Sequence, residues 1–131
     1  MQIEIFSLCD AATTENGKLN ILGAFDAIWS KKFPVVYPKC TLALRARFSA
    51  IERGKHKIAV RFINADGKNI LPPASGEIVV DPPEPQQGVS SNVILNIQSL
   101  KLEAPGEYSL ELNVDGHNLM SLPIFAKKME K

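Results

Sequence analysis

The sequence predicts an all-β fold, a single antiparallel sandwich of about eight strands, and two observations carry this prediction. Several segments alternate apolar and polar residues with period two, which gives each strand one face for a core and one for water. Asn-Gly and Asp-Gly pairs, which are typical of tight hairpin turns, lie between these segments. Many short strands separated by turns predict two packed sheets in Greek-key order, with a closed barrel as the alternative.

The alternating segments define the expected strands and their connections. Asp115-Gly116 predicts a C-terminal hairpin, and residues 52–55 are expected to join 41–48 to 57–64 as a second hairpin. Proline-rich loops at 71–76 and 81–88 flank the segment 77–80, which favours an edge position because proline lacks the ladder donor. The expected strands are about 2–9, 19–29, 41–48, 57–64, 92–100, 108–114 and 118–125, with short ones at 68–71 and 77–80.

Tyr108 narrows the choice of architecture. It begins the penultimate expected strand after the tight turn of Pro105-Gly106-Glu107, as the tyrosine corner of immunoglobulin-like sandwiches does. In that corner the phenol bonds to backbone a few residues upstream, here within residues 102–104. The alternative is an ordinary core aromatic. The antibody cysteine and tryptophan pattern is absent, so the prediction concerns architecture alone.

Length and composition fit one domain over residues 1–131 and exclude several classes of protein. Of 131 residues, 45% are hydrophobic, which suffices for a core and is too much for a disordered chain. No apolar run reaches the ~20 residues of a membrane-spanning helix. The formal net charge of +1 gives no bulk attraction to nucleic acid or anionic lipid.

The N-terminus and the cysteines indicate a cytoplasmic protein. A secretory signal needs a basic stretch before an apolar run, but Glu4 and Asp10 interrupt the first residues and no basic residue precedes Lys18. Cys9 and Cys40 are the two cysteines of the chain, and in a reducing compartment we expect them to be buried thiols rather than a disulfide.

Four stretches of the chain resemble a known family. They are residues 3–12 (IEIFSLCDAA), 17–26 (GKLNILGAFD), 105–110 (PGEYSL) and 121–124 (SLPI). Over nearly its whole length the chain is similar to a family of small bacterial proteins of about this size that carry a domain-of-unknown-function label. The resemblance implies a stand-alone, mostly β protein without an established activity, and it supplies no catalytic residue.

One candidate site is a basic sheet face. If 41–48 and 57–64 form a hairpin, Arg45, Arg47, Lys57 and Arg61 leave the apolar phase of their strands and cluster as an anion contact. The alternative is a solvated face balanced by acids such as Glu111. Nucleic-acid binding has less support, because stacking platforms need exposed aromatic side chains beside the basic groups.

Catalytic, metal and cofactor sites have little support in the sequence, and we expect none of them. Cys9 and Asp10, with His56 or His117, supply the residue types of a cysteine nucleophile, but nothing in the spacing brings them together. Loops such as the one with Asp81 and Glu84 bring one or two acids each, fewer than a calcium site gathers.

The remaining candidate is a protein-contact surface. Residues 31–39 read as a proline-framed loop whose apolar side chains cannot all point into a core from one extended segment. The alternative is that the loop seals an open end of the sandwich. We therefore expect a non-catalytic module that binds a protein partner or assembles as a homo-oligomer, away from membranes. The candidate contact residues are Trp29, Phe33, Val35, Val36 and Tyr37.

Overall fold

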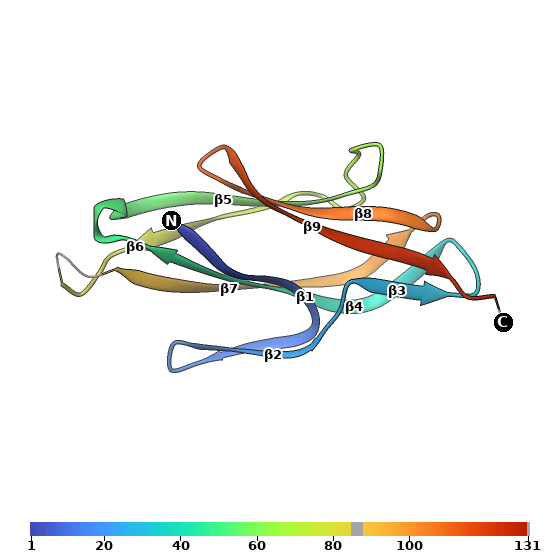
Figure 1. Cartoon of the computed structure of the whole chain (residues 1–131), viewed down its shortest axis with the longest axis horizontal. Helices are drawn as coiled ribbons and strands as arrows, with labels where there is room; N and C mark the ends of the chain where they lie inside the picture. The colour runs from blue at the N-terminus through green and yellow to red at the C-terminus, as the bar shows by residue number, and fades with distance from the viewer. Residues whose placement is uncertain (85–87, 131) are drawn as a thin grey trace.

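The computed structural model describes residues 1–84 and 88–130, and in this part of the chain nine strands form two packed sheets (Figure 1). One sheet has four antiparallel strands in the order β2-β1-β4-β7, and the other has five in the order β3-β9-β8-β5-β6. The expected all-β sandwich is confirmed, with nine strands instead of about eight. Residues 85–87 of the second proline-rich loop lie outside the described residues.

The strands follow one another along the chain with one short 3-10 turn, η1, after the fourth. None of the described residues belongs to a helix long and apolar enough to cross a membrane. The elements are β1 (Gln2–Glu15), β2 (Lys18–Ala24), β3 (Ala27–Ser30), β4 (Val35–Phe48), η1 (Ala50–Glu52), β5 (Gly54–Ile63), β6 (Ala74–Val80), β7 (Val89–Leu102), β8 (Gly106–Val114) and β9 (His117–Lys128).

The core lies between the two sheets and consists of the inward phase of each strand. The inward phases expected for β4, β5 and β8 are confirmed, since alternate residues of these strands belong to one buried cluster. Burying them removes apolar surface from water, which is the main stabilising term of such a sandwich. Fully buried members include Leu8, Leu42, Phe48, Leu100, Leu102, Leu110, Leu112 and Ile124.

Two of the turns expected from the sequence close hairpins. Asn16-Gly17 joins β1 to β2, and Asp115-Gly116 joins β8 to β9. All four residues have positive φ, between 50° and 84°, which Asn, Asp and Gly tolerate best. The strand expected at 68–71 is wrong, because a single bridge between Ile63 and Asn69 is all that forms after Gly67.

The hairpin expected between 41–48 and 57–64 is wrong. β4 pairs with β1 and β7, whereas β5 pairs with β6 and β8 in the other sheet. A capping box at Ser49 and Glu52 folds the connection into the turn η1, so the chain passes from one sheet to the other. The residues of a local turn explain why the chain reverses direction, but they do not determine which strand β5 pairs with.

The expectation of purely antiparallel sheets is also wrong. β3 runs parallel to β9, with Ala27 opposite Phe125 and Ser30 opposite Lys128. The single strand expected at 19–29 is therefore two strands, β2 and β3, in different sheets. The chain crosses between them at Phe25 and Asp26, whose backbone bonds to Leu8 and Phe125 on the two sides.

The four-stranded sheet curls because β1 changes partner along its length. Residues Gln2 to Cys9 pair with β4, and Cys9 to Glu15 pair with β2. The β1–β2 hairpin then extends below the layer that contains β4 and β7 (Figure 1). This hairpin covers part of a face that the alternating pattern assigns to solvent.

Three outward-facing residues are buried where the hairpin covers the sheet. Cys9, Thr41 and Ala43 are at most 1% exposed, yet they do not belong to the inter-sheet core. They occupy the outward phase of β1 and β4, where β2 contacts β4. Their side chains are small, which suits a close approach of the hairpin to the sheet.

Candidate functional site

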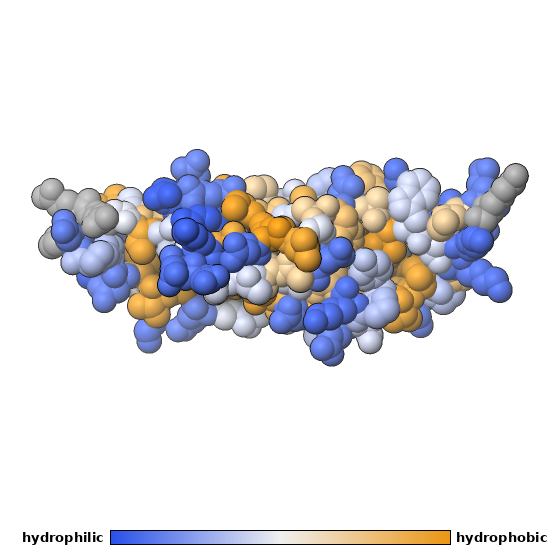
Figure 2. Space-filling model, turned by 90° about the horizontal axis from the view of Figure 1, so that it is seen from below, coloured by the Kyte–Doolittle hydropathy of each residue, from blue (hydrophilic) through white to orange (hydrophobic). Residues whose placement is uncertain are grey.

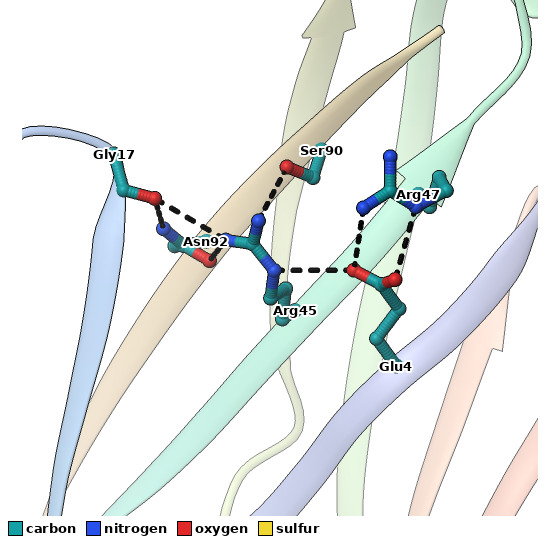
Figure 3. Close-up of polar contacts among 6 residues, drawn as sticks. All are labelled: Glu4, Gly17, Arg45, Arg47, Ser90 and Asn92. Carbon is teal, nitrogen blue, oxygen red and sulfur yellow. Dashed lines mark hydrogen bonds and ion pairs between the residues drawn. The ribbon is translucent and has the colours of Figure 1, made fainter.

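Arg45 is the centre of a polar network on the outer face of the four-stranded sheet (Figure 3). Its guanidinium donates to Oδ1 of Asn92 at 2.8 Å and to Oγ of Ser90 at 2.8 Å, both on β7. It also donates to the carbonyl oxygen of Gly17 at 3.3 Å. Asn92 donates to the same carbonyl at 3.1 Å. The network therefore holds the tip of the β1–β2 hairpin over β4 and β7.

Glu4 completes the network and neutralises part of its charge. Its carboxylate accepts from Nε of Arg45 at 3.1 Å and from Nε of Arg47 at 2.9 Å. Glu4 is the extra residue of a β-bulge between Ile3 and Ile5, which aims its side chain at β4. The hydrogen bond from Arg47 is the largest of the causes that hold the pKa of Glu4 below its usual range.

The basic face expected from Arg45, Arg47, Lys57 and Arg61 does not form. Arg45 and Arg47 lie in β4, and the other two lie in β5 of the opposite sheet. Arg61 donates to Oδ1 of Asn69 at 3.0 Å and to the carbonyl of Gly67 at 3.3 Å. Three of the four cations thus have partners within the chain, and the four do not share a surface.

His56 and Cys9 also lie apart. Nδ1 of His56 is 2.7 Å from Oδ2 of Asp115, and its Nε2 is 2.6 Å from the carbonyl oxygen of Glu52. Both acceptors raise the pKa of His56, and the hydrogen bond with the Glu52 carbonyl is the larger cause, ahead of the one with Asp115. Cys9, in the other sheet, donates to the carbonyl of Thr41 at 3.3 Å. A histidine with both ring nitrogens occupied has none left to activate a thiol.

The two thiols are free and buried. Cys40 packs in the inter-sheet core, whereas Cys9 occupies the outer face of the same sheet. Burial raises the pKa of Cys9 and raises that of Cys40 to about 11. A reactive cysteine needs the opposite shift, toward the thiolate. Among residues 1–84 and 88–130, no three His, Cys, Asp or Glu side chains gather as a metal site requires.

The expected loop at 31–39 is largely strand, because β4 begins at Val35. Phe33, Val35 and Tyr37 pack against the core, so these three side chains seal one end of the sandwich. Val36 and Trp29 remain 52% and 57% exposed. The proposed patch of five is thus reduced to two exposed side chains, which lie on β4 and β3.

Trp29 stands over the end of β9. Nζ of Lys127 lies 5.1 Å from the centre of the Trp29 ring and 5.7 Å from that of Phe125. An ammonium between two rings is attracted by both, so part of the aromatic surface is covered by the chain itself. Trp29 is therefore a weaker anchor for a partner than its exposure alone suggests.

A cleft opens between β6 and β7, where the two sheets end on the same side of the sandwich. Its volume is about 180 Å³. That is too small for a drug-sized ligand and similar to a cavity that holds benzene. The space fits one aliphatic side chain of a partner. Its lining is mostly apolar and includes Leu42, Leu44, Ile58, Val60, Val93 and Leu95, with 74–77 of β6 at the mouth.

The β7 edge beside this cleft is the longest edge strand of the described residues. Between 89 and 100 it contains no charged residue and no proline, two of the devices that usually prevent a further strand from pairing. The other edges are shorter. β2 begins with Lys18, β3 has four residues, and β6 contains Glu77 and is followed by Pro82-Pro83.

The surface seen from below supports a local contact rather than a broad one (Figure 2). Hydrophobic residues lie in several groups along this face, one of them near its middle, with hydrophilic residues between and around them. A partner that needs a large apolar patch finds none continuous across this view. A backbone-driven contact along one edge needs no such patch.

Sequence reasoning identified 92–100 as a strand and did not single out its edge. Edge position depends on which strands pair, and β4, the strand with which β7 pairs, is distant in sequence. One signal was present, the absence of charge from 89 to 100. The bulge at Glu4 also left a signal, since the apolar phase shifts between Ile3 and Phe6.

Solved structures with a similar fold come from larger proteins. Two are crystal structures of a β-glucosidase from Listeria innocua, in complex with isofagomine and with gluconolactone. They match with TM-scores of 0.53 and 0.52 and identities of 9% and 12%, over 94% of this chain and 16% of theirs. The alkylpurine DNA glycosylase AlkC of Pseudomonas fluorescens, bound to DNA containing an abasic site analog, matches with a TM-score of 0.48 and 12% identity, over 78% and 28%.

This chain spans less than a third of the length of each of these proteins. The likeness to the β-glucosidase concerns the fold alone. Comparison with curated proteins gives no match. The resemblance of the sequence to a domain of unknown function is confirmed by a family model that matches residues 4–127, and the chain belongs to DUF6941, a family of unknown function.

Proposed function

We propose that this protein is a non-catalytic, cytoplasmic bacterial module with an immunoglobulin-like sandwich, and that it binds an extended segment of a protein at the β7 edge. The observation that carries the proposal is the uncharged edge of β7 beside the aliphatic cleft. An added strand bonds to the edge through its backbone, and a side chain in the cleft gives selectivity.

The strand arrangement supports the immunoglobulin-like part of the proposal. β8, with Tyr108 near its start, lies between β5 and β9 in one sheet, and β4 lies between β1 and β7 in the other. The hydroxyl of Tyr108 bonds to backbone upstream, as in a tyrosine corner. This architecture does not by itself specify a function, so the proposal rests on the β7 edge and the cleft.

Alternative functions have less support. Anion or nucleic-acid binding was based on four cations that lie in two different sheets, with Arg45 and Arg47 sharing Glu4. A cysteine-dependent enzyme needs a thiolate, and burial favours the protonated thiol at both cysteines.

A variant of Gly76 tests the proposal. Gly76 pairs with the buried Ile58 and therefore shares its inward phase, and a Cβ at this position would meet no atom within 4 Å. Gly76→Leu is expected to fill the cleft in a folded protein. Val79→Leu is the matched control, because Val79 lies in the same strand, faces the opposite side, is 62% exposed and does not line the cleft.

The experiment is a selection of random peptides displayed on phage. We expect the wild-type protein to enrich extended peptides with aliphatic residues at alternate positions, and we expect binding to be lost in Gly76→Leu and kept in Val79→Leu. Failure to enrich any peptide, or binding that ignores the filled cleft, would contradict the proposal.

A further inference from the structure

We infer that the strand bound at the β7 edge is β7 of a second copy of this chain, antiparallel and with Ile94 on the two-fold axis. The inference rests on the proposed function and names its partner. It requires one continuous sheet in which β7 of each copy supplies the unpaired edge of the other. Such a contact is isologous, so the same residues must suit both sides.

Residues 92–96 of β7 are self-complementary about Ile94. An antiparallel pairing centred there places Val93 opposite Leu95 of the second copy and Asn92 opposite Asn96. At these central positions apolar residues meet apolar ones and amides meet amides, whereas the next inward pair sets Ser91 opposite Ile97. Further out, Ser90 meets Gln98. No pair in this register brings like charges together, which would oppose association.

The inward side of the contact continues the cleft. Val93 and Leu95 line the cleft and pair with Leu44 and Leu42 of β4, so they lie in the inward phase. In the proposed register the same two residues of the second copy extend this apolar row. Leu95 of one copy and Val93 of the other would close the cleft from the side.

The outward side is already ordered. Oδ1 of Asn92 accepts from Arg45 at 2.8 Å, and Oδ1 of Asn96 accepts from Thr41 Oγ1 at 3.0 Å. Side chains held before association lose little conformational entropy when a partner arrives. The network around Arg45 therefore prepares the outward face of β7 for pairing as well as holding the hairpin.

Cysteine cross-linking tests the register. Ile94→Cys places two thiols opposite each other across the axis, within disulfide reach. In Val93→Cys alone the two thiols are diagonal neighbours, beyond easy reach. In an equal mixture of Val93→Cys and Leu95→Cys, the thiol of one variant lies directly opposite the thiol of the other. Cys9 and Cys40 are both 0% exposed and do not compete.

We expect a covalent dimer on mild oxidation of Ile94→Cys and of the mixture, and little from Val93→Cys alone. The mass of the wild-type protein in solution is the second readout. Sedimentation from micromolar to millimolar concentration is expected to show particles of twice the chain mass. Ile94→Lys sets two ammonium groups side by side and should weaken association by about 10-fold or more.

A wild-type protein that remains monomeric at every concentration overturns the inference. Equal cross-linking of the three single cysteine variants, Val93→Cys, Ile94→Cys and Leu95→Cys, also overturns it. Neither result touches the proposed function, which the peptide selection tests separately. Peptides that bind at the cleft of a strictly monomeric protein would leave the edge as a site for another protein's strand and exclude the second copy.

Discussion

The hydroxyl of Tyr108 donates a 2.7 Å hydrogen bond to the carbonyl oxygen of Ala104, four residues upstream. This bond closes the connection by which the chain leaves β7 in one sheet and enters β8 in the other. Tyr108 is 6% exposed and its ring meets that of Phe62 edge to face, with 6.5 Å between the centroids. One side chain therefore fixes both the core and the crossing between sheets.

Tyr108→Phe should lower the free energy of unfolding by about 0.5–1.5 kcal/mol, the usual net contribution of one hydrogen bond. The ring remains in place, so packing is kept. The urea midpoint measures the change. An unchanged midpoint would mean that the bond to Ala104 contributes nothing and that Tyr108 acts only as a core aromatic.

Leu112→Ala should cost about 2–5 kcal/mol, because it removes a buried Leu and leaves a cavity between the sheets. Leu112 is 0% exposed, whereas Leu22 is 70% exposed and provides the control. Leu22→Ala should stay within about 0.5 kcal/mol of the wild type. Similar costs for both variants in urea denaturation would contradict the assigned inward phase of β8.

Arg45→Ala should destabilise the protein more than Arg47→Ala. Arg45 donates to four acceptors, on the hairpin tip, on β7 and at Glu4 of β1, and its loss should cost about 1–3 kcal/mol. Arg47 is 50% exposed and bonds to Glu4 alone, so its loss should cost about 0–1 kcal/mol. Thermal or urea unfolding of the two variants gives the comparison. Equal costs would mean that the network around Arg45 stabilises the protein no more than the contact of Arg47 with Glu4 does.

The pair of His56 and Asp115 should make stability depend on pH. The folded protein raises the pKa of His56 above its ordinary 6.5, so the charged ring stabilises the fold below that pH and this contribution is lost as pH rises through the folded value. The pKa of Asp115 is lowered from 3.8, chiefly by the hydrogen bond with His56, so its contribution is lost as pH falls through the lowered value.

The pair therefore contributes most between about pH 4 and 6.5. Urea midpoints across this range and above should decline at the alkaline side in the wild type. The decline should be smaller in Asp115→Asn, which keeps a residue tolerant of the positive φ of 50° at this turn. The same decline in both proteins would mean that the pair does not couple folding to protonation.

Residue pattern alone predicted the local features of this fold well. Alternation assigned Leu42, Leu110 and Leu112 to the core, and Pro105-Gly106 before Tyr108 predicted a bond to backbone within residues 102–104, which forms at Ala104. These features depend on residues near one another in the sequence. The two glycine turns at residues 17 and 116 belong to the same class, since a two-residue turn carries its own requirement for positive φ.

Partner choice between strands could not be predicted. Residues 52–55 look like a turn between two strands, but the pattern does not say that β5 joins the other sheet. The parallel pair of β3 and β9 connects Ala27 to Phe125 across most of the chain, and no local signal marks it. The misjudged basic face followed directly from the hairpin that these residues did not form.

The residue pattern indicated only weakly that the hairpin covers the outer face of the sheet. Cys9, Thr41 and Ala43 are small, and small outward residues are compatible with a hairpin packed above them as well as with solvent. The hairpin's position is set by the carbonyl of Gly17 on Arg45 and Asn92, a contact between residues far apart in sequence.

Amide hydrogen exchange followed at several protein concentrations tests the central claim most directly. If the β7 edge is the contact site, its amides between residues 89 and 100 should become better protected as concentration rises, while the edges of β2, β3 and β6 should not change. Exchange in β7 that is the same at every concentration, with or without peptides from the selection, would contradict the account.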